Sequence, residues 1–182
     1  MTIIGLDLAG LPSNPTGFAL LINHKFEAGL VYLDEDIVEL CSRSRPALVA
    51  IDAPLSLPAS GNLRLADRLL IERGLRVFPP TFASMKKLTA RGIRLAGELR
   101  GKGIKVIEIH PLTSGKILFE TSKRQTWLSK LKRRRWTVGQ NMSEHEADAV
   151  VAALTAWLHL KGMTEEIGAA GEGTIVIPRG PL

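Results

Sequence analysis

An apolar run near the start of the chain, IIGLDLAG at residues 3–10, contains one aspartate, Asp7. Such a run is typical of a strand buried in a sheet, where an unpaired carboxylate carries a large free-energy cost. Asp7 therefore needs a cation beside it, either a metal ion or a basic side chain such as Arg64 or Arg68. The nature of this partner decides between a functional and a purely structural role for Asp7.

The pattern of apolar runs and breaks predicts a mixed α/β fold. Three strands are expected at 3–9, 16–23 and 26–33, and the short connections between them favour an antiparallel meander. A helix over 34–43 then leads to the apolar run at 47–52, which is typical of a central strand covered on both faces.

The second half of the chain alternates helices with further apolar runs. We expect helices at 63–73, 82–100 and 143–161, a strand at 104–109, and a short apolar run, TIVIP, near the end. This order predicts an α/β sheet that combines the meander with parallel strands, with helices on both faces.

Length and composition fit one globular domain. The chain has 182 residues, of which 45% are hydrophobic, so we expect a single domain over 1–182 with a basic insertion at about 112–141. The only cysteine, Cys41, allows no internal disulfide and favours a reducing compartment. No signal peptide and no apolar run of about 18–20 residues is recognised. We therefore expect a soluble, cytoplasmic protein that does not associate with membranes.

The charge of the chain favours a polyanionic partner. The net charge is +6 and the isoelectric point is about 9.8, which indicates nucleic acid or, alternatively, a solvated basic surface. The segment 123–136, KRQTWLSKLKRRRW, has seven basic residues, two tryptophans and no acid. Basic side chains bind phosphates and tryptophan stacks on exposed bases. The alternative is a basic helix whose tryptophans lie in the core. The expected nucleic-acid contacts are Lys123, Arg124, Trp127, Lys130, Lys132, Arg133, Arg134 and Arg135.

Four acidic residues occupy positions that suit a common site, at the ends of strands and on the last helix: Asp7, Asp52, Glu108 and Asp148. In that helix, Ser143 and Glu146 form a capping box, and His145 lies three residues before Asp148 on the same face. If the helix packs near the first strand, His145 and Asp148 face Asp7 and Asp52.

Converging carboxylates repel one another, and a divalent cation relieves that repulsion. Oxygen ligands favour Mg²⁺ or Mn²⁺, and a histidine at the edge suits Mn²⁺ better. Two such ions, about 3.5–4 Å apart, would support phosphodiester hydrolysis. Each acid also has an ordinary explanation: Asp52 as a turn residue, Asp148 as a surface acid, and Glu108 as the partner of Lys105 or Arg94.

The local sequence resembles the RNase H-like superfamily. An aspartate in the first strand, a loop that ends in Thr16-Gly17, an acid that ends the fourth strand, and the helix sequence HEADAVVAAL are similar to Holliday-junction resolvases of the RuvC type. The chain more closely resembles a family of uncharacterised predicted nucleases with an RNase H fold. The matching stretches cover nearly the whole chain and include GLDLAG, AIDAPLSLP, RLADRLLIERGLRVFPP, VIEIHP, SEHEADAVVAALTAWL and GTIVIP.

The resemblance implies a metal-dependent nuclease that acts on DNA or RNA. It implies that Asp7, Asp52, His145 and Asp148 bind Mg²⁺ or Mn²⁺, and that the same three aspartates are catalytic. Glu108 lies in VIEIHP, a stretch typical of the closer family, and is a further catalytic candidate whose role stays open. Resolvases usually carry glutamate at the position of Asp52.

Two other functions are compatible with the fold. A nucleic-acid-binding module would have kept the fold and lost the chemistry. A phosphoryl-transfer enzyme of the actin and sugar-kinase type needs two such halves, and 182 residues supply one. The clustered acids favour the nuclease over the binding module, because negative charge beside phosphate does not help binding.

Overall fold

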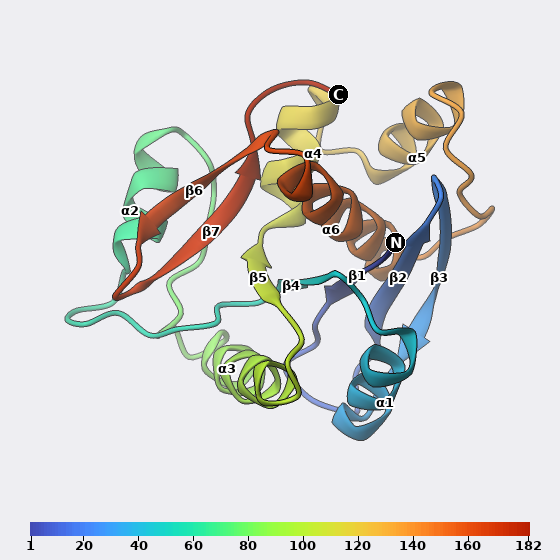
Figure 1. Ribbon diagram of the computed structural model, residues 1–182. Helices are drawn as coiled ribbons and strands as arrows, with labels where there is room; N and C mark the ends of the chain where they lie inside the picture. The colour runs from blue at the N-terminus through green and yellow to red at the C-terminus, as the bar shows by residue number, and fades with distance from the viewer.

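One seven-stranded sheet runs through the computed structural model, which describes residues 1–182, in the order β3-β2-β1-β4-β5-β7-β6 (Figure 1). The predicted meander is present as β1 (Thr2–Asp7), β2 (Thr16–Ile22) and β3 (Lys25–Val31), paired antiparallel. The fold class predicted from the sequence, an α/β fold of the RNase H-like type, is thereby confirmed.

The other half of the sheet contains three strands parallel to β1. These are β4 (Leu48–Asp52), β5 (Val106–Ile109) and β7 (Gly173–Pro178). The edge strand β6 (Thr164–Ala169) pairs antiparallel with β7. The carboxyl ends of β1, β4 and β5 therefore meet at one edge of the sheet, where open α/β sheets bind their ligands.

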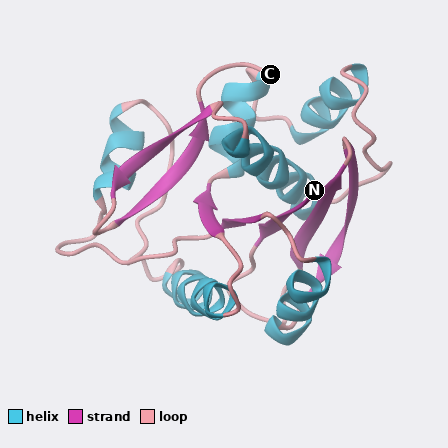
Figure 2. Ribbon diagram, in the orientation of Figure 1, coloured by secondary structure: helices cyan, strands magenta, loops and turns pink.

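Helices cover both faces of the sheet (Figure 2). On one face, α1 (Asp34–Ser44) and α3 (Lys86–Gly101) share a core with Ile4, Leu6 and Ile51. The other face is covered by α4 (Pro111–Phe119), α5 (Arg124–Arg133) and α6 (Glu144–Leu160). The short helix α2 (Leu65–Glu72) packs on β6 and β7. None of the helices combines the length and apolar character needed to cross a bilayer.

Two elements differ from the sequence predictions. The segment expected as a basic insertion at 112–141 contains two helices, and α4 begins one residue before it because Pro111 suits the first turn of a helix. The strand β6 was not predicted. Its sequence, TEEIGA, has two acids and little apolar alternation, and its pairing with β7 supplies the order that its own residues do not.

Two glycines allow α6 to lie directly on β1 and β2. A Cβ atom added at Gly5 would lie 2.1 Å from the carbonyl oxygen of Ala149, and one added at Gly17 would lie 2.1 Å from that of His145. Both distances are far below van der Waals contact, so no side chain fits at either position. This close approach brings the first turns of α6 over the end of β1, where Asp7 lies.

We predict that Gly5→Ala pushes α6 away from β1 and lowers the free energy of unfolding by at least about 1–3 kcal/mol, the usual cost of overpacking. Urea denaturation measures the change. Gly97→Ala is the matched control, because nothing lies within 4 Å of its added Cβ on the exposed side of α3. That variant gains about 0.5–1 kcal/mol from the removal of a helical glycine. Equal stability of the two variants would contradict the close packing of α6.

Candidate active site

Asp7 and Asp52 are neighbours at the carboxyl edge of the sheet. They end the parallel strands β1 and β4 and lie opposite each other in the register of these strands. Burial raises the pKa of Asp7, while a hydrogen bond and the charge of His145 act in the opposite direction. Burial and then the charges of Asp7, Asp148 and Glu108 raise the pKa of Asp52 well above its ordinary value.

Asp7 has a basic partner and Asp52 has none. Nδ1 of His145 contacts Asp7, whereas no lysine, arginine or histidine forms an ion pair with Asp52. Burial and the surrounding carboxylates raise the pKa of Asp52, so a cation bound beside it would lower that pKa.

The capping box predicted at the start of α6 is confirmed. The Ser143 hydroxyl accepts from the amide of Glu146, and the Glu146 carboxylate accepts from the amide of Ser143. This cap fixes the first turn of α6 and with it His145, whose Nδ1 lies 2.7 Å from Oδ2 of Asp7. The partner of Asp7 is thus a histidine that is 48% exposed, and neither Arg64 nor Arg68 contacts it.

Asp148 lies one turn further along α6 and is held by Arg124 of α5. The Arg124 guanidinium donates from Nε at 2.8 Å to Oδ1 and from Nη2 at 2.6 Å to Oδ2. Its Nη1 lies 3.5 Å from Glu144. Burial raises the pKa of Asp148 to about 6, although the hydrogen bonds from Arg124 act in the opposite direction. Arg124, which was predicted to bind nucleic acid, therefore neutralises Asp148, a candidate metal ligand.

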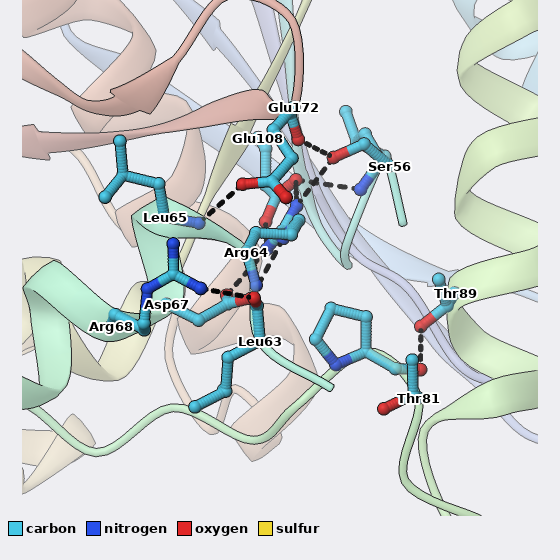
Figure 3. Close-up of polar contacts among 12 residues, drawn as sticks. Ser56, Leu63, Arg64, Leu65, Asp67, Arg68, Thr81, Thr89, Glu108 and Glu172 are labelled. Atoms are coloured by element: carbon cyan, nitrogen blue, oxygen red, sulfur yellow. Dashed lines mark hydrogen bonds and ion pairs between the residues drawn. The ribbon is translucent and has the colours of Figure 1, made fainter. Parts of the chain in front are cut away.

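Glu108 reaches the same edge from β5 and is held in a buried network (Figure 3). Its two carboxylate oxygens each lie 2.7 Å from a terminal nitrogen of Arg64, and one also accepts from the amide of Leu55 at 2.8 Å. Arg64, which is 1% exposed, directs its remaining donors to Asp67 and Ser56. The partner of Glu108 is thus Arg64, and not Lys105 or Arg94.

Two arginines at the start of α2 lie in different surroundings. Arg64 and Asp67 are buried in the Glu108 network, while Arg68 is exposed and donates to the carbonyl of Leu63 at 3.1 Å. The loop over Glu108 is held further by Glu172, whose carboxylate accepts from the amide of Leu65 at 2.7 Å (Figure 3). It also accepts from the amide of Ala59 at 2.7 Å. These hydrogen bonds to Leu55, Ser56 and Ala59 hold the loop that follows Asp52 in place.

The basic segment folds around buried tryptophans. Trp127 is 0% exposed, its ring packs on Gly115, and its Nε1 donates to the carbonyl of Thr121 at 2.7 Å. The prediction that Trp127 stacks on a base is therefore wrong, because no face of the ring reaches the surface. Lys130 donates to the carbonyl of Phe119 at 2.7 Å. The exposed cations of the segment are Lys123, Lys132, Arg133, Arg134 and Arg135.

Arg91 has a positioning role that the sequence analysis did not identify. It is buried in α3 and donates to Oδ1 of Asp34 at 2.7 Å, to the carbonyl of Ala9 at 2.7 Å and to that of Tyr32 at 2.6 Å. It thereby ties the loop after Asp7 to α1. The signal in the sequence is an arginine among the apolar positions of the predicted helix 82–100.

The candidate metal ligands are not gathered into one group. No group of three or more histidine, cysteine, aspartate or glutamate side chains lies in position to hold a metal ion. The carboxylates of Asp7 and Asp52 are adjacent and Asp7 contacts His145, whereas both oxygens of Asp148 are occupied by Arg124. Asp148 becomes available as a ligand only when Arg124 leaves.

Comparisons with known proteins agree with this fold. A family model described as "Protein of unknown function (DUF429)" matches residues 5–172. RuvC of Thermus thermophilus in complex with a Holliday junction substrate superposes with a TM-score of 0.58 at 15% identity, covering 89% of this chain and 96% of that chain. A further Thermus thermophilus RuvC structure gives a TM-score of 0.54 at 15% identity, with 89% and 97% covered. No curated protein matches the chain. At this identity the likeness shows a shared fold.

We predict that Arg64→Leu lowers the free energy of unfolding by about 3–5 kcal/mol, because it leaves the buried carboxylates of Asp67 and Glu108 without a cation. Thermal and urea denaturation measure the loss. Arg68→Ala is the matched control on the exposed side of α2, and we expect a change within about 0.5 kcal/mol. An Arg64→Leu variant as stable as the control would show that the network does not stabilise the fold.

Proposed function

Because the chain belongs to the family described as "Protein of unknown function (DUF429)", we propose its activity from its own site: a divalent-metal-dependent nuclease that hydrolyses phosphodiester bonds of DNA or RNA. The observation that carries the proposal is the convergence of Asp7, Asp52 and Asp148 at the carboxyl edge of an RNase H-like sheet. The fold shared with RuvC, solved with a Holliday junction, supports it.

The proposed metal ligands are Asp7 and Asp52, joined by Asp148 and His145. Carboxylate oxygens with one imidazole suit Mg²⁺ or Mn²⁺, and a bound ion would relieve the repulsion between Asp7 and Asp52. When bound, such ions activate water and neutralise charge on the phosphate that is attacked. His145 orients the Asp7 carboxylate through its Nδ1 contact.

Arg124 has two competing partners in this proposal. Its fork of donors matches a carboxylate and a phosphate equally well. A strand that approaches the site brings a phosphate, and Arg124 turns from Asp148 to that phosphate. The carboxylate of Asp148 is then free to join Asp7 and Asp52. Substrate binding would thus complete the set of three aspartates.

The exposed cations around Arg124 are the proposed contacts to the rest of the strand. Lys123, Lys132, Arg133, Arg134 and Arg135 are exposed on α5 or directly beside its two ends. They continue the positive charge of Arg124 away from the carboxylates, in agreement with the net charge of +6. Contacts of this kind bind the phosphate backbone without reading sequence.

A non-catalytic nucleic-acid-binding module is the second candidate. The Arg124–Asp148 ion pair favours it, since it neutralises one acid without a metal. In that case the site would bind no divalent cation with useful affinity, and nucleic acid would bind without being cut.

We also propose a cytoplasmic location. Cys41, the only cysteine, is buried on α1 and carries a free thiol. Burial raises the pKa of this thiol to about 12, which keeps it protonated and unreactive. A chain whose stability relies on no disulfide is suited to a reducing compartment.

We predict that Asp7→Asn folds normally but loses Mn²⁺-dependent cleavage by more than about 100-fold, since even groups behind metal ligands are worth 10–100-fold. Labelled single strands, duplexes and four-way junctions of DNA and RNA serve as substrates. Asp36→Asn, the same change at an exposed acid of α1, is the control and keeps full activity. Unchanged cleavage by Asp7→Asn would contradict the proposed site. Binding without cleavage by the unaltered protein would favour the binding module.

A further inference from the structure

A cavity of about 190 Å³ lies beside Asp52 and has no role in the site described so far. It lies between the carboxyl ends of β4 and β5, the start of α2 and the loop that leads into α3. Its apolar walls are Pro54, Val77, Phe78, Met85 and Leu88. The cavity is therefore next to the proposed position of the phosphate, on the side away from Asp7.

Most polar side chains at the cavity are hydrogen-bonded to one another. Arg64 has five N–H donors, and all five are used by Asp67, Ser56 and Glu108. The polar side chains of the lining that lie outside this network are those of Asp52 and His110. Nδ1 of His110 lies 2.8 Å from the hydroxyl of Thr113, which leaves Nε2 without a hydrogen bond.

The charge of the lining excludes a phosphate as the occupant of the cavity. Its one arginine has no free donor, and burial lowers the pKa of His110 to about 4, so this ring is neutral. A ligand that suits this lining is uncharged, with apolar surface for the walls and a hydrogen-bonding group for His110. A nucleobase has these properties.

An aromatic ring stands at the rim of the cavity on a fixed loop. Phe78 is 58% exposed although it lines the cavity. The hydroxyl of Thr89 donates to the carbonyl of Pro80 at 3.0 Å (Figure 3). The hydroxyl of Thr81 lies 3.0 Å from Oδ1 of Asn62. An exposed ring held in place beside an apolar cavity is a platform on which a base can stack.

We propose that this cavity receives the base of an unpaired nucleotide adjacent to the phosphate at Asp7 and Asp52. The inference rests on the proposed function and specifies its substrate class. The cavity is smaller than the roughly 300–1,000 Å³ of sites for drug-sized ligands, so it takes one ring system. A base within a duplex enters only after it has left its stack and its partner. The substrate is therefore a strand with unpaired bases, and a fully paired duplex is a poor substrate.

The test is binding in the absence of divalent metal, so that no strand is cut. Ten-nucleotide single strands of DNA and RNA are compared with an abasic sugar–phosphate chain of the same length. We expect the unaltered protein to bind the strand with bases about 5- to 150-fold tighter, the range of one base–aromatic stack. Phe78→Ala and the cavity-filling Val77→Trp should bind both chains with the weaker affinity. A paired duplex should bind equally to all three proteins.

The control is Phe82→Ala, which removes another exposed ring from the same loop region without altering the cavity lining. It should retain the full preference for bases. Equal binding of both chains by the unaltered protein would overturn the inference and leave the nuclease proposal intact. Binding of neither chain would overturn both. A nucleoside monophosphate that binds as tightly as the strand would reassign the cavity to a free nucleotide and also overturn it.

Discussion

The packing of α6 against Gly5 and Gly17 determines the geometry of the whole site. Without side chains at these positions, the helix backbone lies directly on β1 and β2. The capping box at Ser143 then fixes where the helix begins, and His145 and Asp148 follow one turn apart. Asp7 of the strand and Asp148 of the helix thus come together because Gly5 and Gly17 have no side chains and because the capping box fixes the start of α6.

Charge balance is the second constraint on the site. Asp7, Asp52 and Asp148 are gathered where water is largely excluded, which raises the pKa of each. The protein balances two of them, with His145 on Asp7 and Arg124 on Asp148, while no basic side chain forms an ion pair with Asp52. In the proposed reaction, a metal ion would supply positive charge beside Asp52, and Arg124 would exchange Asp148 for a phosphate. Glu108 is different, because its buried pair with Arg64 fixes the walls of the neighbouring cavity.

Local patterns in the sequence predicted the elements and the meeting of Asp7 with the last helix. Apolar runs defined the strands, and the capping box with helical spacing placed His145 and Asp148 on one face. The partners of Glu108 and Asp148 were not predictable, because Arg64 is 44 residues from Glu108 and Arg124 is 24 residues from Asp148. The burial of Trp127 depends on Gly115 of a helix that was not predicted. The cavity is formed by five separate segments and has no sequence signature.

The most direct test of the carboxylate site is the anomalous scattering of Mn²⁺ in crystals grown with a short, uncleavable single strand. The result expected is a peak within about 2–2.5 Å of carboxylate oxygens of Asp7 and Asp52, with the Arg124 guanidinium turned from Asp148 to a phosphate. A strand bound with no Mn²⁺ at these aspartates, and with the Arg124–Asp148 pair intact, would contradict the metal site and favour a protein that binds nucleic acid without cutting it.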